Sequence, residues 1–417
     1  MLDLRLIRRD PEAARTALAR RGDAAGLDRV LDLDARRREI LPELEALRAE
    51  QNEANAAIAA ARKAGLGAEE AIARMREVAG RAKVLGEELA TVEGELQPAL
   101  AALPNLPDPT AAPQDTVVRT WGEPPELGFE PMDHLELAGE RIDMERAARL
   151  SGSRFAYLRG DLVMLELALV RWTLDKVRRH GFEPVIPPVL VREEALYGTG
   201  FLPDTEQQIY RLADDDLYLV GTSEVALASL HAGDILEADE LPRRYAGFSS
   251  CFRREAGAAG KDTRGIFRVH QFDKVEMFCF VEPDASPAEH ERLLAIEEEI
   301  LQELGIPYRV VNIAVDDLGA SAAKKYDCEA WLPSQSRYRE LTSCSNTTDY
   351  QARRLEIRHR AEGAKRPETL HTLNGTACAV GRTIIALLEN GQREDGSVQL
   401  PEVLVPYGAP AALPSAG

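Results

Sequence analysis

Two long stretches near the start of the chain carry apolar or small residues at alternating steps of four and three. The first contains Leu33, Arg37, Ile40, Leu44, Leu47, Gln51, Ala54, Ile58 and Ala61, and the second Val78, Ala82, Leu85, Leu89, Val92, Leu96, Ala99 and Leu103. This is the spacing of a coiled-coil seam. Between them, Ala64-Gly65-Leu66-Gly67 suits a chain reversal. The pattern predicts an antiparallel helical hairpin, with helices of about 35 residues and on the order of 50 Å long, extending beyond a globular body.

Shorter elements follow a group of prolines at positions 98, 104, 107, 109 and 113, which are expected to end the helix and mark a domain boundary. We predict helices over residues 162–180 and 376–388, and strands over 217–220, 266–281, 308–315 and 338–343. Strands joined by long loops favour a largely antiparallel sheet flanked by helices, an α+β fold. The predicted domains are residues 1–110 and 111–408, and the Ala/Pro/Ser-rich segment 409–417 is predicted to be a disordered tail.

The charge of the chain limits how it can meet nucleic acid. A formal net charge of −19 excludes a generally basic nucleic-acid binder, so any RNA contact must come from a local patch. The hairpin carries such a patch near its reversal, at Arg62, Lys63, Arg74 and Arg76, whereas glutamates dominate nearer its base. These cations form either an ordinary solvated helical face or a surface that contacts RNA phosphates.

The cysteines and the apolar runs of the sequence indicate the cellular compartment of the protein. The five cysteines are odd in number and contain no Cys-x-x-Cys pair, which argues against a disulfide framework or a zinc ribbon and favours a reducing compartment. The first ten residues have no apolar signal core, and no apolar run reaches about 20 residues, the length of a membrane span. We therefore expect a cytoplasmic protein without a membrane segment.

The richest chemistry lies between residues 251 and 281. Cys251-Phe-Arg-Arg-Glu255 precedes a loop, residues 256–265, that contains Gly257, Gly260, Lys261, Arg264 and Gly265 and could close over a polyphosphate. In the strand predicted to follow, alternation places Phe267, Val269, Val275 and Met277 on one face and Arg268, His270, Phe272, Lys274 and Glu276 on the other. Cations suit phosphates, an aromatic ring suits a base, and a carboxylate suits a small polar substrate. An amphipathic strand with one solvated face is the alternative, but Arg253-x-Glu255 favours a nucleotide site.

These residues resemble motif 2 of the class II aminoacyl-tRNA synthetases, in Phe252-Arg253-x-Glu255, Arg268 and Phe272. Ala379-Val-Gly-Arg382 is similar to motif 3, and Gly181-Phe182 with Pro188 is similar to motif 1, the dimer-interface element. Five further segments resemble the seryl members of the class: residues 196–200 (LYGTG), 221–224 (GTSE), 270–276 (HQFDKVE), 339–346 (RELTSCSN) and 373–376 (LNGT). Each motif alone is weak. Their family order behind a helical hairpin makes a specific signal that covers residues 1–408.

The resemblance implies a reaction and a set of ligands. Members activate L-serine with ATP and Mg²⁺ to give seryl-adenylate and pyrophosphate, and transfer serine to the 3′-hydroxyl of tRNA(Ser) and of tRNA(Sec), working as homodimers. Arg253, Arg268 and Arg382 are implied as catalytic. The implied ATP site comprises Arg253, Arg254, Glu255, Arg268, Val269, Phe272, Glu340, Leu341, Thr342, Ser343 and Arg382. The implied serine site comprises Thr222, Ser223, Glu224, Arg253, Glu276 and Thr376. Glu340 and Ser343 are the implied metal ligands, and Arg62, Lys63, Arg74 and Arg76 the tRNA contacts.

Simple strand and helix geometry raises a question about two of these assignments. Glu340 and Ser343 have opposite parity, so both reach one ion only if the strand twists or bulges between them. Thr376 is also a good helix N-cap, which offers a structural reason for its presence.

Other functions remain as alternatives. An amino acid:carrier-protein ligase shares the catalytic core but lacks the long hairpin, and a catalytically inactive RNA-binding paralogue has no need of Arg253, Glu276, Glu340 and Arg382 together. A nucleotide site of the Rossmann type is disfavoured, because the chain has neither His-x-Gly-His nor Gly-x-Gly-x-x-Gly.

Overall fold

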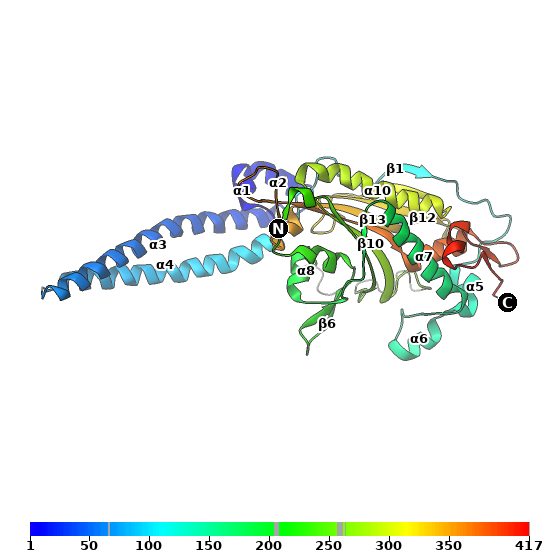
Figure 1. Cartoon of the computed structure of the whole chain (residues 1–417), viewed down its shortest axis with the longest axis horizontal. Coiled ribbons are helices and arrows are strands. Elements are labelled where there is room, and N and C mark those ends of the chain that lie inside the picture. Colours follow the sequence, from blue (N-terminus) through cyan, green and yellow to red (C-terminus); the bar gives the residue numbers. More distant parts are fainter. Residues whose placement is uncertain (66, 204–207, 257–261, 263, 417) are drawn as a thin grey trace. The chain divides into compact units, whose positions relative to one another are not determined.

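A computed structural model describes residues 1–417 except 66, 204–207, 257–261, 263 and 417 (Figure 1). The chain forms two compact units, residues 2–104 and residues 105–417 with Met1. None of the helices in the described part combines the length and the apolar character needed to cross a membrane.

In its described residues, the first unit consists of four helices: α1 Leu4–Arg9, α2 Pro11–Ala19, α3 Ala25–Lys63 and α4 Glu69–Ala102. Helices α3 and α4 lie side by side and antiparallel (Figure 1). Every predicted seam position is buried or half-buried, with Ile40, Leu44 and Leu47 of α3 among the most deeply buried. Gly65 has φ +71° at the reversal, a conformation that favours glycine, while Leu66 lies outside the described residues. The predicted hairpin is therefore confirmed.

Pro98 does not end the second long helix, contrary to the sequence prediction. Helix α4 continues through Pro98 to Ala102. A proline inside a helix costs about 3 kcal/mol. On either side of it Leu96 and Leu100 are each only 2% exposed, and burial of one such side chain contributes about 1.5–3 kcal/mol. Packing of the helix against its neighbours thus outweighs the local penalty.

An eight-stranded sheet forms the centre of the second unit, in the order β1-β11-β12-β13-β16-β10-β9-β4. These strands are β1 Thr116–Trp121, β4 Glu183–Val185, β9 Arg243–Phe252, β10 Gln271–Val281, β11 Tyr308–Asn312, β12 Lys324–Leu332, β13 Arg337–Thr348 and β16 His371–Ala379. All neighbouring pairs are antiparallel except β4 and β9. The predicted α+β class with an antiparallel sheet flanked by helices is confirmed.

Eight helices and several short strands accompany this sheet in the described part of the unit. The helices are α5 His134–Ala138, α6 Met144–Ser151, α7 Asp161–Arg179, α8 Glu193–Thr199, α9 Glu224–Ala228, α10 Ser286–Glu303, α11 Tyr350–Arg354 and α12 Val380–Asn390. The short strands are β2 Ile142–Asp143, β3 Tyr157–Leu158, β5 Leu190–Val191, β6 Tyr210–Leu212, β7 Leu217–Leu219, β8 Ile235–Glu237, β14 Arg358–Arg360, β15 Glu368–Thr369, β17 Val398–Gln399 and β18 Ala412–Leu413.

Strand β10 shows how side-chain alternation divides core from site. Val275, Met277 and Cys279 point into the main core, to which α7, α10 and α12 contribute. On the opposite face, Phe278 and Phe280 enter a second apolar cluster with residues of α9 and α11. The residues of that face nearer the start of the strand are Phe272, Lys274 and Glu276. One face of β10 is thus apolar from Val275 onward, after Gln271 and Asp273 at its start, and the other changes from polar to apolar at Phe278.

Two predicted element boundaries are wrong in a way that affects the site. The strand predicted over 266–281 begins only at Gln271, because the backbone N–H of Ile266 donates to a histidine side chain instead of a neighbouring strand. The helix predicted over 376–388 begins at Val380, with Ala379 as its N-cap. Thr376 therefore lies in strand β16, opposite Glu276, and is not a helix cap.

The C-terminal tail is ordered within the described residues, contrary to the predicted disorder. Strand β18 pairs with β17, and Leu413 is fully buried in the main core. Composition suggested disorder because small residues and prolines dominate the segment, but burial of Leu413 and Ala409 anchors it.

All five cysteines lie in the described part of the chain, and each is buried as a free thiol. Burial raises the pKa of every one of these thiols. They are therefore unreactive core residues.

Candidate active site

A cleft of about 660 Å³, open to solvent, lies where the polar face of β10 meets β13, β16 and the start of α12. Its lining consists of Arg253, Glu255, Ile266, Phe267, Arg268, Val269, Phe272, Lys274, Glu340, Leu341, Thr342, Ser343, Thr376, Ala379, Gly381 and Arg382. The cleft thus brings together all of the predicted ATP-site residues except Arg254, whose side chain is exposed outside it.

Three arginines lie over the rings of Phe267 and Phe272, two residues of the cleft lining. The guanidinium carbons of Arg339 and Arg382 lie 3.9 and 4.6 Å from the centre of the Phe267 ring, and that of Arg253 lies 5.3 Å from the centre of the Phe272 ring. Cation–π contacts of this kind hold planar cations over aromatic faces. The cleft therefore presents positive charge next to flat apolar surfaces, which suits a nucleotide.

Phe267 is predicted to lie on the apolar face of a strand, but the structure places it in the cleft lining. Alternation does not apply to it, because β10 begins four residues later. The sequence also assigned no role to Arg339, which the structure places over the Phe267 ring and in an ion pair with Asp262.

Glu255 and Arg268 form an ion pair across the cleft. Arg268 Nη1 donates to Glu255 Oε2 at 2.6 Å. Glu255 has φ +51°, which turns the chain as it leaves β9. Gly257, Gly260 and Lys261 of the predicted flap lie outside the described residues.

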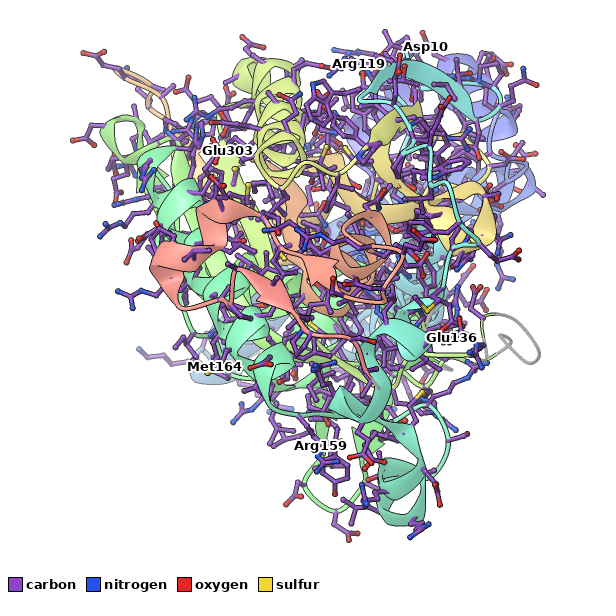
Figure 2. The ribbon with its side chains drawn as sticks, turned by 90° about the vertical axis from the view of Figure 1, so that its right-hand side faces the viewer. Asp10, Arg119, Glu136, Arg159, Met164 and Glu303 are labelled. Carbon is purple, nitrogen blue, oxygen red and sulfur yellow. The ribbon has the colours of Figure 1, made fainter. Side chains whose placement is uncertain are left out.

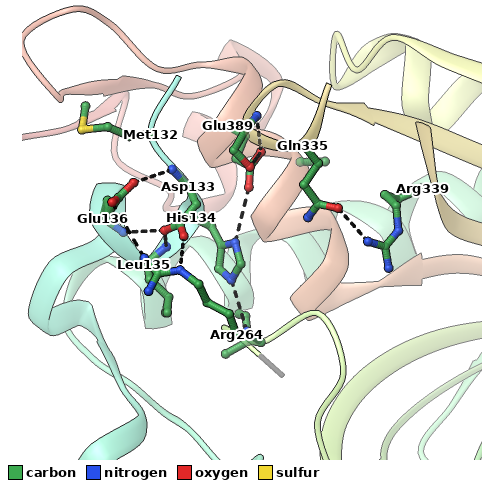
Figure 3. A network of polar contacts seen from close by, with 12 residues as sticks. Met132, Asp133, His134, Leu135, Glu136, Arg264, Gln335, Arg339 and Glu389 are labelled. Atoms are coloured by element: carbon green, nitrogen blue, oxygen red, sulfur yellow. Dashed lines mark hydrogen bonds and ion pairs between the residues drawn. The ribbon is translucent and has the colours of Figure 1, made fainter. Parts of the chain in front are cut away.

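The segment from Arg264 to Ile266 is fastened by the start of helix α5 (Figure 3). Ile266 N–H donates to His134 Nε2 at 3.2 Å, so Nδ1 carries the ring hydrogen and faces Glu389 Oε1 at 3.4 Å. Glu389 belongs to α12, and its other oxygen accepts from Ser334 Oγ at 2.7 Å. Arg264 forms an ion pair with Asp133. His134 therefore joins the residues that precede Phe267 and Arg268 to the helix that begins beside Arg382.

Gly265 leaves room for this contact. It has φ +75°, and a β-carbon built on it would lie 1.9 Å from His134 Nε2. Gly265→Ala should therefore displace Phe267 and Arg268 and raise KM for ATP about ten-fold or more, since backbone strain of this kind costs about 1–3 kcal/mol. The ATP dependence of pyrophosphate exchange measures this.

Two further variants identify the cause of that effect. His134→Ala in the Gly265→Ala chain should recover part of the loss by freeing the space. Gly128→Ala, whose β-carbon meets no atom within 4 Å, should leave KM unchanged. An unaltered KM in Gly265→Ala would show that the contact has no bearing on ATP.

A β-bulge at Leu341 resolves the parity conflict between Glu340 and Ser343. Ser343 lies opposite Asp327, and Glu340 lies opposite Glu329, with one extra residue on β13 between these pairs. Because Asp327 and Glu329 point to the same face of β12, the bulge brings Glu340 and Ser343 to one face as well.

Glu340 is held ionised by its neighbours. The Glu340 side chain is 47% exposed, and against the cost of its partial desolvation the charges of Arg382, Lys325 and Arg253 hold its pKa below the ordinary value. Arg382 Nη1 also donates to the Glu340 backbone carbonyl at 3.0 Å. A carboxylate and a hydroxyl oxygen are hard ligands of the type that Mg²⁺ prefers, so these two residues fit the ion.

A buried group of carboxylates lies beside the cleft. Glu276 is 2% exposed, forms an ion pair with Lys274, and accepts from Thr376 Oγ1 at 3.4 Å. Burial raises its pKa to about 7 against the pull of Lys274, with Glu224 adding to the rise. Glu224 is itself 6% exposed, and burial raises its pKa too.

The structure brings most of the predicted serine-site residues together and leaves Ser223 apart. Glu276, Glu224 and Arg253 interact electrostatically with one another, and Thr222 Oγ1 accepts from Glu224 N–H at 3.2 Å. Ser223 does not join them, because its buried hydroxyl donates to the Gly247 carbonyl at 3.3 Å. Thr222, Ser223, Glu224 and Glu276 are not among the lining residues of the open cleft.

The predicted tRNA contacts lie in the first unit near the reversal of the hairpin. Arg62, Lys63, Arg74 and Arg76 are all exposed. Arg74 pairs with Glu50 at 2.6 Å, and the other three make no ion pair with any residue that the structure describes. Nearer the base, Arg36 and Arg37 pair with Glu88 and Glu93 of the other helix.

Comparisons with known proteins place both units in one family. Residues 1–107 match the seryl-tRNA synthetase N-terminal domain, and residues 208–391 match the tRNA synthetase class II core domain (G, H, P, S and T). A serine–tRNA ligase of Nocardia farcinica is 52% identical over 98% of both chains.

Solved structures agree over the whole length. The seryl-tRNA synthetase from Pyrococcus horikoshii complexed with ATP is 42% identical, with a TM-score of 0.94 over 100% of both chains. The cytoplasmic serine–tRNA ligase from Naegleria fowleri in complex with AMP is 31% identical, with a TM-score of 0.90 over 100% of this chain and 99% of the other. The carrier-protein ligase and the inactive paralogue are thus not favoured. The chain belongs to the seryl-tRNA synthetase family, as an ATP-dependent class II ligase that activates serine and charges tRNA with it.

Proposed function

We propose that the open cleft binds ATP and that the buried carboxylates beside it select serine. The observation that carries this is the convergence of Arg253, Arg268 and Arg382 on one cleft, with Glu276 and Thr376 paired at its edge. Phe272 stacks on the adenine, and Glu255 accepts from its amino group. Arg253 holds the α-phosphate, while Arg268 and Arg382 neutralise the β- and γ-phosphates.

The reaction needs no side-chain nucleophile. The serine carboxylate attacks the α-phosphorus, the bond from that phosphorus to the bridging oxygen breaks, and pyrophosphate leaves with the electron pair. Negative charge moves onto the leaving phosphates, where Arg268 and Arg382 stabilise it. The tRNA 3′-hydroxyl then attacks the carbonyl carbon of seryl-adenylate and releases AMP.

Glu340 and Ser343 are proposed to hold Mg²⁺, which supplies charge neutralisation to the phosphates when bound. The Arg382 contact with the Glu340 carbonyl keeps these ligands next to the phosphate-binding arginine. Leu341 and Thr342 belong to the same wall of the cleft.

Serine is recognised at both polar ends in this proposal. Glu276 accepts from the serine hydroxyl with Thr376 beside it, and Glu224 with Thr222 accepts from the ammonium group. Exchange of labelled pyrophosphate into ATP, measured with each of the twenty amino acids, tests this assignment. Serine should support exchange far better than every other amino acid, and equal exchange with alanine would overturn the proposed role of Glu276.

We also propose that the chain works as a homodimer through α7 and β4. Apolar side chains are exposed along this region: Val163, Met164, Leu167, Ile186 and Leu190, with Ile186 83% exposed. Figure 2 looks onto the part of the surface that carries Met164. Exposed apolar side chains that gather on one surface mark interaction sites, and a two-fold axis buries the same surface on both copies.

Sedimentation tests the homodimer. The parent chain should sediment at about twice its 45.9 kDa, and Leu167→Glu should shift it toward the monomer, because a charge there is buried in the interface. Leu150→Glu changes an equally apolar residue that is 72% exposed on α6, and should leave the dimer intact. A monomeric parent chain at micromolar concentration would refute the proposal.

The helical hairpin is proposed to hold the tRNA, through Arg62, Lys63, Arg74 and Arg76. The expected substrates are tRNA(Ser) and tRNA(Sec), and the expected compartment is the cytoplasm. The N-terminal family model spans the whole hairpin, which supports this division of labour.

A further inference from the structure

Gln351 occupies a closed position behind the proposed serine site. It lies in the short helix α11, and its side chain is fully buried. Its amide contacts four other elements, at Thr199 of α8, Glu224 of α9, Thr347 of β13 and Thr372 of β16. No catalytic motif of the sequence pointed to this residue.

The orientation of the Gln351 amide is fixed by a neighbour that can only accept. The Thr199 backbone carbonyl lies 3.2 Å from the amide nitrogen, so that nitrogen, and not the oxygen, must face it. The same nitrogen donates its second hydrogen to Glu224 Oε1 at 2.7 Å. The amide oxygen accepts from Thr372 Oγ1 at 2.9 Å and from Thr347 Oγ1 at 3.3 Å.

This arrangement gives Glu224 one fixed partner on the side away from the cleft. Rotation of the Gln351 amide would place its oxygen against the Thr199 carbonyl and against the carboxylate, leaving buried polar groups unpaired. Donation from Gln351 to Glu224 favours the ionised carboxylate, in opposition to the burial that raises the pKa of Glu224. Lys274, Arg253, Asn374 and Glu276 also lie near that carboxylate.

We propose that Gln351 is a positioning residue for serine, which holds Glu224 so that its carboxylate accepts from the serine ammonium group. This rests on the proposed assignment of Glu224 to the serine site. Gln351 does not touch substrate, and it acts through Glu224 alone. By donating to Glu224, the Gln351 amide favours the ionised carboxylate, which can accept from the cationic ammonium group of serine.

Gln351→Leu and Gln351→Glu test this in different ways. Leucine removes the donor at similar volume, and glutamate turns the donor into an acceptor that faces Glu224. In serine-dependent pyrophosphate exchange, Gln351→Leu should raise KM for serine about 10- to 100-fold, the effect of one hydrogen bond to a charged group, and Gln351→Glu should raise it further. KM for ATP should change by less than about three-fold, because the hydrogen-bond partners of Gln351 among the described residues are Thr199, Glu224, Thr347 and Thr372, none of which belongs to the proposed ATP site.

A double-variant cycle with Glu224→Gln separates this role from a merely structural one. If Gln351 acts through Glu224, Gln351→Leu should add less than about three-fold to KM for serine in the Glu224→Gln chain. Equal losses in both backgrounds, or a parallel rise in KM for ATP, would overturn the role of Gln351 and leave that of Glu224 intact. An unchanged KM for serine in Glu224→Gln would instead overturn the assignment of Glu224 and the present proposal with it.

Discussion

Glu276→Ala should lower serine-dependent pyrophosphate exchange by two or more orders of magnitude and narrow the preference for serine over alanine. Glu276 is 2% exposed and paired with Thr376 and Lys274 at the edge of the cleft. When free alanine binds to the parent enzyme in place of serine, the buried Glu276 carboxylate has no hydroxyl donor. Sites of this kind reject a substrate analogue that lacks the hydroxyl by about 10⁴-fold or more. Threonine keeps the hydroxyl, so only pocket size excludes it, which is a weaker filter.

The ion pair with Lys274 complicates this experiment and also supplies its control. The sequence pattern alone predicts either a site residue that can be replaced with little loss of thermal stability, or a carboxylate on the solvated face of an amphipathic strand. The structure instead buries both partners, with Lys274 7% exposed, and removal of one member of a buried pair costs about 3–5 kcal/mol. Glu276→Ala should thus lower Tm as well as activity.

Adding Lys274→Met to Glu276→Ala removes the unpaired cation and separates the two effects. Stability of the double variant should largely recover, since replacing a buried pair by apolar residues is often neutral. Serine exchange should stay as low as in Glu276→Ala. Recovery of exchange together with Tm would show that Glu276 is structural, and exchange within a few-fold of the parent in Glu276→Ala would remove its assigned role altogether.

The pH dependence offers an independent view of the same carboxyl group. Burial raises the pKa of Glu276 to about 7, and kcat/KM for serine reports the free enzyme. If the ionised group accepts from the serine hydroxyl, kcat/KM should fall about ten-fold from about pH 8 to about pH 6. Glu276→Gln, which cannot ionise, should flatten this limb.

Periodicity predicted the helical hairpin because it depends on spacing alone. Residues from Leu33 to Leu103 repeat the same local rule, and the structure buries or half-buries each seam position. The tail and Pro98 were predicted wrongly for the opposite reason. Each depends on what a distant part of the unit packs against it, and single leucines such as Leu413 decided the outcome.

The sequence predicted those residues of the site that belong to recognisable motifs. The ATP-site residues that the motifs named converge on the cleft, except Arg254. The bulge at Leu341 was required by parity, and its position followed only from the pairing of β12 with β13. His134 and Gln351 could not be found, because each acts from a short helix far away in the sequence, through a hydrogen bond that no spacing encodes.

Deleting residues 36–97, with a short linker in their place, should spare serine activation and abolish tRNA charging. The deletion removes the apolar cluster of Leu44, Leu47, Val78 and Ala82 as a whole. Leu27, Val30, Leu100 and Leu103, which are buried at the base, remain. All the proposed ATP and serine contacts lie beyond residue 200. Pyrophosphate exchange should therefore stay within a few-fold of the parent, whereas aminoacylation should fall below detection.

Charge-reversing substitutions near the turn of the hairpin test the proposed tRNA contact without a deletion. Changing Arg62, Arg74 and Arg76 to Glu should weaken tRNA binding, and the slope of log K against log salt should flatten by about 0.7–0.9 for each phosphate that the protein no longer neutralises. Arg29→Glu, at a 66% exposed position near the base, should change neither quantity. Because serine activation should be unaffected in every one of these variants, a loss confined to charging assigns the hairpin to tRNA. Normal charging by the deletion variant would show that the tRNA is held elsewhere.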